Sequence, residues 1–156
     1  LMLTAVALAV AAMPEGLPGP DECRVEPFNA NFPNAEARVV PPTTVTPEGN
    51  EVSSTMWLRI REPLADDRLM HSCALAYLSD IGTGFLSIDQ PGLPKGGPSL
   101  DHAMWFRVPL RADEWVLHHM WPLHAGGARG LYAGSMFQHD GTLGVTITQE
   151  SLLRPS

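Results

Sequence analysis

A single segment of helical periodicity, set among segments of strand periodicity, constrains the fold of this chain more than any other feature. From Asp66, the expected helix N-cap, apolar residues recur at helical spacing until two glycines end the run: Leu69, Met70, Cys73, Ala74, Tyr77 and Ile81, then Gly82 and Gly84. One strand is expected before this helix and four after it. That order implies an α+β fold in which an antiparallel sheet of about five strands wraps one long helix.

Alternation of apolar and polar residues predicts the strands. Before the helix, one half-buried strand is indicated by the alternating positions Val52, Ser54, Met56, Leu58 and Ile60, and Pro63 closes it. After the helix, a loop rich in proline and glycine leads to four strands, at residues 100–108, 114–123, 129–139 and 142–153. The pair Asp140-Gly141 between the last two strands is a strong signal for a two-residue hairpin turn.

The first residues form an apolar run, LMLTAVALAVAAM over positions 1–13, that is too short to span a bilayer. Its content of β-branched residues is low, so the pattern leaves strand and helix undecided. A signal-peptide core is the alternative, which we rank below a buried strand or core segment because no basic residues precede the run.

Residues 14–50 are interrupted by eight prolines: Pro14, Pro18, Pro20, Pro27, Pro33, Pro41, Pro42 and Pro47. Each proline removes a backbone hydrogen-bond donor and holds the preceding residue in extended geometry. We therefore expect this stretch to be a linker that crosses a surface and not a packed unit.

Composition excludes several functional classes. Ten Lys and Arg against seventeen Asp and Glu leave a net charge of −7, which argues against nucleic acid or an anionic membrane as partner. Cys23 and Cys73 lie far apart, so neither a disulfide framework nor a cysteine zinc site is expected, and a reducing compartment is the default. The six histidines lack metal-binding spacing, and no glycine-rich segment leads from a strand into a helix. We expect no metal and no cofactor.

Two polar residues interrupt predicted apolar faces, where a buried polar group costs free energy unless it is used or hydrogen-bonded. Asp80 projects from the edge of a helix stripe that contains Leu69, Cys73 and Ala76. An exposed residue at a fraying helix end explains Asp80 equally well, although the helix dipole disfavours a carboxylate there. Gln149 continues a strand face formed by Leu143, Val145 and Ile147, but a strand that leaves the core at its end is the better explanation on pattern alone.

Ser99 is a third polar candidate, at the junction between the loop and the next strand. A serine at such a junction is usually a turn residue. A triad with Asp101 and His102 is poor chemistry, because strand alternation places Ser99 and Asp101 on one face and His102 on the other. The sequence also lacks the G-x-S-x-G element of serine hydrolases.

Residues 99–106, SLDHAMWF, resemble the SLDH-S-MWF signature of the acyl-CoA thioesterase II family. Further segments are similar to that family in unbroken order over about residues 51–154, namely 75–80, whose helix ends in Y-x-S-D, and 111–115, 125–130, 138–141 and 148–150. The resemblance implies a hotdog fold, in which a sheet wraps a long helix. Family members carry two hotdog units, and this chain looks like the second, at residues 51–156. Residues 1–13 then resemble the last strand of the first unit, and residues 14–50 the linker.

Carried over by motif, the family's catalytic residues correspond to Asp80, Ser99 and Gln149. The resemblance implies hydrolysis of acyl-CoA thioesters to free fatty acid and CoA, a reaction of fatty acid and lipid metabolism. The three residues would hold and activate a water, with Asp80 as general base and Ser99 as a positioning group. Two departures, Ala103 and Arg107, concern substrate fit more than chemistry.

Two other functions compete with hydrolysis. One is a non-catalytic acyl-binding or structural half that pairs with another hotdog unit. The other is a hydratase, which needs an Asp–His pair that the sequence does not offer in a matching context. A lone unit exposes a strand edge and an apolar sheet face, so we expect a homo-oligomer or pairing with another hotdog unit. The final Arg-Pro-Ser is not a peroxisomal signal, which favours the cytoplasm.

Overall fold

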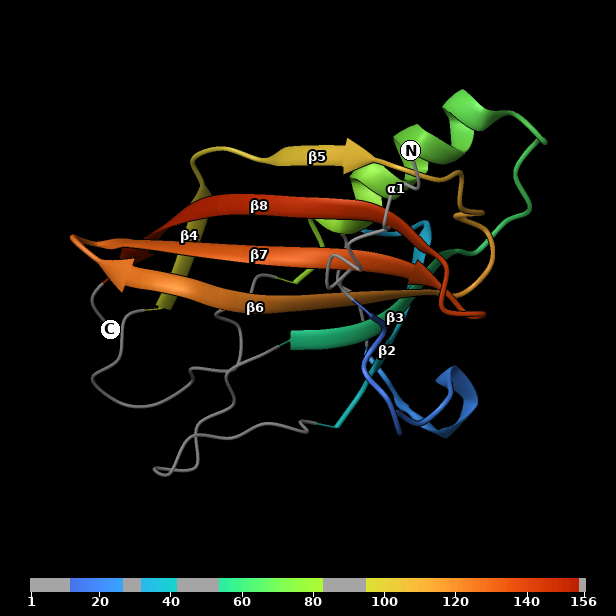
Figure 1. The fold of residues 1–156 in the computed structure, drawn as a ribbon, viewed down its shortest axis with the longest axis horizontal. Coiled ribbons are helices and arrows are strands. Elements are labelled where there is room, and N and C mark those ends of the chain that lie inside the picture. The colour runs from blue at the N-terminus through green and yellow to red at the C-terminus, as the bar shows by residue number, and fades with distance from the viewer. Residues whose placement is uncertain (1–11, 27–31, 42–53, 83–94, 155–156) are drawn as a thin grey trace, which may run out of the picture.

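One α-helix packs against a large antiparallel sheet in the computed structural model, which describes residues 12–26, 32–41, 54–82 and 95–154 (Figure 1). The sheet order is β1-β2-β3-β6-β7-β8-β4, and β5 also pairs with β8. The elements are a short 3-10 helix η1 (Pro20–Glu22), α1 (Arg68–Ser79), β1 (Arg24–Val25), β2 (Ala35–Val39), β3 (Ser54–Ile60), β4 (Lys95–Ser99), β5 (Ala103–Phe106), β6 (Val116–Gly126), β7 (Arg129–Gln138) and β8 (Leu143–Arg154). The predicted α+β arrangement is confirmed.

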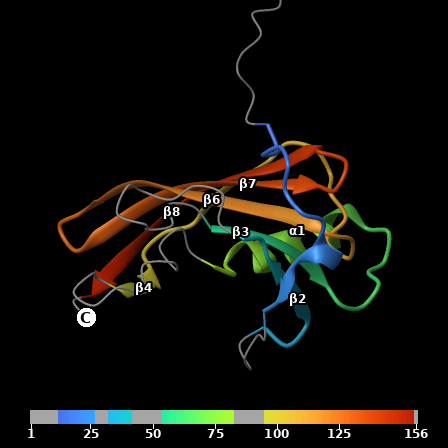
Figure 2. The same ribbon diagram turned by 90° about the horizontal axis from the view of Figure 1, so that it is seen from below.

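Three long strands form the centre of the sheet. β6, β7 and β8 run side by side along the longest dimension of the molecule, and α1 lies next to β3 (Figure 2). The main core fills the space between α1 and the sheet, with fully buried residues such as Leu58, Leu78 and Met136. A smaller cluster around Trp57 and Phe137 covers the other face.

The described part of the chain has eight strands, more than the five expected. Two of the extra strands, β1 and β2, come from the proline-rich stretch that we expected to be an unpacked linker. β2 pairs with β3 over five residues, and Ala35 and Ala37 are completely buried in the main core. The expectation fails here because Pro33 and Pro41 flank β2 without interrupting it, and the extended geometry that proline favours suits a strand. Residues 1–11 lie outside the described residues.

The remaining extra strand is β4, which forms at the end of the loop predicted before the strand at 100–108, and that predicted strand is shortened to β5. Both pair with β8, but Ser99 lies opposite Ser151 while Ala103 lies opposite Thr148. Three residues between these pairs on one side, 100–102, therefore match two on the other, 149–150, which defines a bulge. The Asp101 side chain fills the gap in the ladder by accepting a hydrogen bond from the Glu150 N–H at 2.9 Å.

The helix forms where it was expected, but its buried face is a different one. Leu69 and Met70, assigned to the buried stripe, are 72% and 48% exposed, whereas the buried positions are His71, Leu75, Leu78 and Ser79. The pattern misled because His71 is polar and yet buried, where its Nδ1 accepts a hydrogen bond from the Ala112 N–H at 3.2 Å. The N-cap is Asp67 and not Asp66, since its carboxylate accepts from the N–H groups of Leu69 and Met70.

The turn between β7 and β8 is longer than the predicted two-residue hairpin. Residues 139–142 separate the two strands, and the Gln138 N–H donates to the Thr142 carbonyl at 2.9 Å. Gly141 has a φ of 87°, a left-handed conformation that glycine adopts without strain. The glycine of the predicted pair is therefore used, in a wider loop.

Gly144 in β8 provides a test of the packing. A Cβ at this position would overlap the side chain of Leu110, which is only 3% exposed and has little room to move. We expect Gly144→Ala to lower the free energy of unfolding by about 1–3 kcal/mol in urea denaturation. Gly19→Ala is the control, because its nearest new contact is an ordinary 3.6 Å to Glu22. Equal stability of the two variants would contradict the packing described.

Candidate active site

Asp80, Ser99 and Gln149 meet at one point, although 69 residues separate the first from the last. Asp80 caps the C-terminal end of α1, Ser99 ends β4, and Gln149 lies in the middle of β8 with 1% of its surface exposed. The Gln149 amide nitrogen donates to Asp80 Oδ1 at 3.2 Å and also to Ser99 Oγ. The structure thus brings together all three residues that the sequence singled out.

The ends of two elements bring the partners to Gln149. Ser99 and Ser151 are register partners, so the Ser99 side chain lies on the same face of the sheet as Gln149, two residues along β8. Directly after Ser99 the chain enters the bulge, where the Leu100 N–H donates to the Glu150 carbonyl at 2.7 Å. On the helix side, Gly82 adopts a φ of 77° just after Asp80 and ends the helical path.

The polarity of these hydrogen bonds determines what the site offers to a ligand. A primary amide nitrogen carries two hydrogens, and Gln149 uses one for Asp80 and one for Ser99. Ser99 Oγ is therefore an acceptor from Gln149, and its own hydroxyl hydrogen is directed elsewhere. The Asp80 side chain remains 56% exposed, so a molecule in solution can reach its carboxylate.

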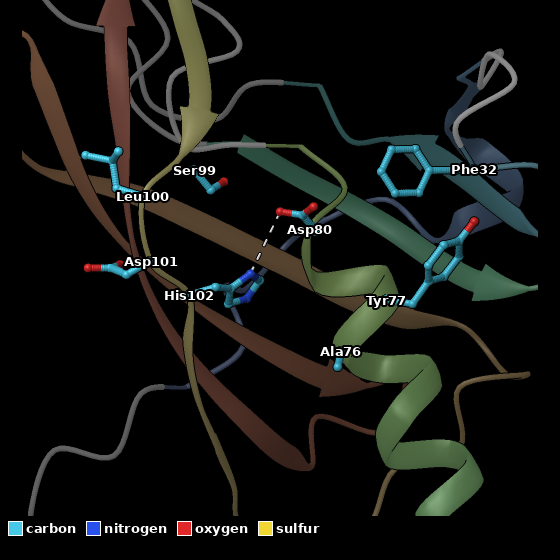
Figure 3. Close-up of a pocket in the computed structure, with 8 residues that line it drawn as sticks. All are labelled: Phe32, Ala76, Tyr77, Asp80, Ser99, Leu100, Asp101 and His102. Atoms are coloured by element: carbon cyan, nitrogen blue, oxygen red, sulfur yellow. Dashed lines mark ion pairs between the residues drawn. The ribbon is translucent and has the colours of Figure 1, made fainter.

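A cavity of about 510 Å³ opens beside this cluster (Figure 3). Its lining combines apolar and polar side chains: Phe32, Ala76, Tyr77, Asp80, Ser99, Leu100, Asp101 and His102. Figure 3 shows Asp80 and Ser99 facing the same space from the helix and from β4. The volume lies in the range of small-molecule sites, and the acidic and hydroxyl groups lie at its edge.

His102 is a site residue that strand alternation assigned to the wrong face. Its Nε2 lies 3.0 Å from Ser79 Oγ, and its Nδ1 lies 3.8 Å from Asp80 Oδ1 (Figure 3, dashed line). Alternation failed because the bulge after Ser99 adds one residue, so Ser99 and His102 both line the cavity. An Asp–His pair, which the sequence did not reveal, is therefore present.

Tyr132 of β7 also belongs to the site, and sequence reasoning missed it because a tyrosine in a strand is usually a core residue. It is fully buried, and its phenol interacts with Ser99. Burial raises the pKa of Tyr132 well above its usual value; the charges of Asp80 and Asp101 add to the rise, while the hydrogen bond with Ser99 opposes it. The phenol is therefore neutral at physiological pH.

The described residues contain neither a metal-binding cluster nor a membrane-spanning helix. Over residues 12–26, 32–41, 54–82 and 95–154, no three His, Cys, Asp or Glu side chains gather in a way that could hold a metal ion. Within the same ranges, no helix has the length and apolar content needed to cross a bilayer.

Among the described residues, one α-helix packed against a large antiparallel sheet is the arrangement that defines the hotdog fold. A hotdog protein of unknown function from Alicyclobacillus acidocaldarius shares the fold with a TM-score of 0.64 over 93% of this chain, at 18% identity. The model of the acyl-CoA thioesterase C-terminal domain matches residues 7–153. The chain therefore belongs to the acyl-CoA thioesterase C-terminal domain family, as its motifs predicted.

Individual relatives agree with this assignment. Acyl-coenzyme A thioesterase 8 of Mus musculus is 40% identical over 124 residues, which are 76% of this chain and 39% of that protein. Acyl-CoA thioesterase 2 of Haemophilus influenzae is 35% identical over 103 residues, 63% of this chain and 36% of that protein. The crystal structure of an acyl-CoA thioesterase II from Mycobacterium marinum has a TM-score of 0.77 at 36% identity, covering 94% of this chain and 57% of that one. The chain thus spans about two fifths of the length of the curated relatives it matches.

His118, which is buried in β6, makes stability depend on pH. Its pKa is lowered to about 3, mainly by burial and also by the nearby His102 and His119, with a hydrogen bond to the Ile81 backbone opposing. The unfolded chain, with a histidine pKa near 6.5, therefore binds more protons between these values, and stability falls as the pH falls below about 6.5.

We expect this histidine to contribute a slope of up to about 1.4 kcal/mol per pH unit to the free energy of unfolding between pH 6 and pH 4. His118→Phe should remove this part of the slope in urea denaturation at several pH values. Met120→Leu, a buried β6 variant that changes no ionisable group, should leave the slope as in the parent. The same slope in the His118 variant and the parent would contradict the buried neutral imidazole.

Proposed function

We propose that this chain hydrolyses acyl-CoA thioesters to a free fatty acid and CoA, using a water held by Asp80, Ser99 and Gln149. The observation that carries the proposal is the double hydrogen bond of the Gln149 amide, which holds a carboxylate and a hydroxyl together at the edge of a cavity. Membership of the acyl-CoA thioesterase family supports the substrate class.

In the proposed reaction, Asp80 accepts a proton from the water while the water oxygen bonds to the thioester carbonyl carbon. The carbonyl electrons move to oxygen, then return as the carbon–sulfur bond breaks, and the CoA thiolate leaves and takes up the proton that Asp80 received from the water. Ser99 positions the water through its hydroxyl. It is not the nucleophile in this scheme, because its oxygen contacts the Gln149 amide, a donor that cannot accept the serine proton.

Holding the reactants in place is the main contribution that this geometry can make. Gln149 is buried and its amide nitrogen donates to both groups, so the Asp80 oxygen and the Ser99 oxygen keep a fixed separation. Orientation of this kind adds to general base assistance, which is typically worth about 10²–10⁴ in rate.

The division of the chain is also proposed. Residues 51–156 form the thioesterase-like hotdog domain, residues 14–50 connect it to a preceding unit and add β1 and β2, and residues 1–13 belong to the last strand of that unit. Support comes from the Mycobacterium marinum thioesterase, of which this chain covers 57%.

The two cysteines are free, which agrees with the expected cytoplasmic location.

A partner is proposed for the edge of the sheet at β5. This strand pairs with β8 on one side, and no described strand pairs with its other side. Trp105 and Phe106 on β5 are 46% and 43% exposed, and Leu69 and Met70 are exposed on α1. An unpaired edge with large apolar side chains is normally covered. A second hotdog unit, from another copy of this chain or from a longer protein, would cover it.

Replacing the proposed base tests the reaction. We expect Asp80→Asn to lower kcat for a medium-chain saturated acyl-CoA at least 10²-fold, because the amide cannot accept the proton of the water. Release of the CoA thiol is followed with a chromogenic thiol reagent. Asp66→Asn is the control, since this carboxylate lies before α1 and its side chain is 98% exposed. Its rate should equal that of the parent.

A full rate in the Asp80 variant would overturn the assignment of the base. A parent chain that binds the acyl-CoA and releases no thiol would instead favour the non-catalytic, acyl-binding half.

The partner is tested by the mass of the chain in solution. We expect light scattering to give twice the monomer mass, and Trp105→Lys to shift it to the monomer because a buried charge would face the β5 interface. Leu123→Lys, which alters an equally exposed apolar residue at 53% in β6, should leave the dimer intact. A parent chain that is monomeric at micromolar concentration and fully active would contradict the proposed pairing.

A further inference from the structure

His102 makes two polar contacts with the end of α1, one through each ring nitrogen. Nε2 lies 3.0 Å from the Ser79 hydroxyl oxygen, and Nδ1 lies 3.8 Å from Asp80 Oδ1. Ser79 is completely buried, whereas the His102 side chain is 22% exposed on the cavity side. The ring is therefore held between a buried anchor and the proposed base (Figure 3).

The contacts of Ser79 determine which ring nitrogen carries the hydrogen. A serine hydroxyl has one hydrogen, and that of Ser79 donates to the Ala76 carbonyl at 2.8 Å. The sulfur of Met104, at 3.3 Å, is a much weaker acceptor and does not compete with a carbonyl. The Ser79 oxygen must consequently accept from His102, so the imidazole carries its hydrogen on Nε2.

With Nε2 occupied in this way, Nδ1 is the nitrogen that faces Asp80. A bare lone pair opposite a carboxylate oxygen is repulsive, whereas a protonated Nδ1 is attractive. A proton taken from solvent onto Nδ1 gives the ring one positive charge opposite the single negative charge of Asp80.

We propose that His102 is a positioning residue for Asp80: anchored by Ser79 through Nε2, it presents an Nδ1–H to the Asp80 carboxylate and keeps that carboxylate directed at Gln149 and Ser99. The arrangement gives Asp80 Oδ1 two partners on different elements, the Gln149 amide of β8 and the imidazole between β4 and β5. The catalytic part of this inference rests on the proposed hydrolysis, but the orientation of the ring does not.

The other titratable groups around the pair do not supply this charge. His118 of β6 faces His102, but burial lowers its pKa to about 3 and keeps it neutral. Tyr132 of β7 is neutral, and Asp101 is a second negative charge near the site. β8 contributes the uncharged Gln149, and β4 the uncharged Ser99. Among the residues that the structure describes, His102 is thus the group in contact with Asp80 that can carry a positive charge.

Two amide variants separate the two nitrogens of His102. The Asn side-chain nitrogen occupies roughly the place of Nδ1, and the Gln nitrogen that of Nε2. We expect His102→Gln, which keeps the Ser79 contact, to lower kcat at least 10-fold with KM changed less than about twofold. His102→Asn, which keeps a donor toward Asp80, should retain several times more activity than the Gln variant. The opposite order would show that His102 only anchors the chain to Ser79 and would overturn the inference, as would loss through KM alone.

The orientation of the ring is read directly by 15N NMR of the histidine nitrogens in the intact chain. On raising the pH, we expect the neutral ring to keep its hydrogen on Nε2 and to lose the one on Nδ1. In Ser79→Ala, which removes the acceptor, this preference should weaken. A neutral ring with its hydrogen on Nδ1 in the parent would overturn the inference even if hydrolysis is observed. An Nε2–H ring in a chain without thioesterase activity would overturn the proposed function and leave the orientation as stated.

Discussion

The hydrogen bonds of one buried amide, that of Gln149, organise the site and the elements around it. A side chain that is 1% exposed must satisfy its N–H groups within the protein, because an unpaired buried donor costs about 1–3 kcal/mol. The two acceptors come from the end of α1 and the end of β4, so the amide ties the helix to the edge of the sheet. The same contacts that satisfy Gln149 place a carboxylate and a hydroxyl at the cavity.

The bulge between β4 and β5 is the second device on which the site depends. It ends the pairing of Ser99 with Ser151 and restarts the ladder at Ala103 with one residue gained. Without the extra residue, strand alternation would direct His102 away from the face that carries Ser99. The Asp101 carboxylate stabilises the irregular backbone by accepting a hydrogen bond from the Glu150 N–H. Neighbouring residues of one short motif therefore have different structural roles.

The motif resemblance predicted the fold, the family and the grouping of Asp80, Ser99 and Gln149, but periodicity alone would have missed part of the site. The helix stripe that contains Leu69 is exposed and not buried as predicted. Asp80 reaches the site because it caps the C-terminal end of α1, and not because it borders a buried stripe. The buried face of the helix was misassigned because it contains His71. A histidine counts as polar in a hydropathy pattern even where it is buried and accepts a hydrogen bond from a backbone N–H. No sequence pattern identified Tyr132 as a site residue, because its burial beside Ser99 follows from the register of β7 with β8.

The α1 helix, the strand β3 before it, the long strands β6, β7 and β8 and the three separated polar positions were determined by the amino-acid sequence by itself, because local periodicity, turn residues and short motifs depend on neighbours along the chain. The addition of β2 to the sheet, the pairing of β4 with β8 and the approach of His102 to Asp80 were decided only by the tertiary structure. The physical reason is that strand partners and buried hydrogen bonds join residues distant in sequence. Their geometry is set by register and by bulges, which a one-residue shift changes completely.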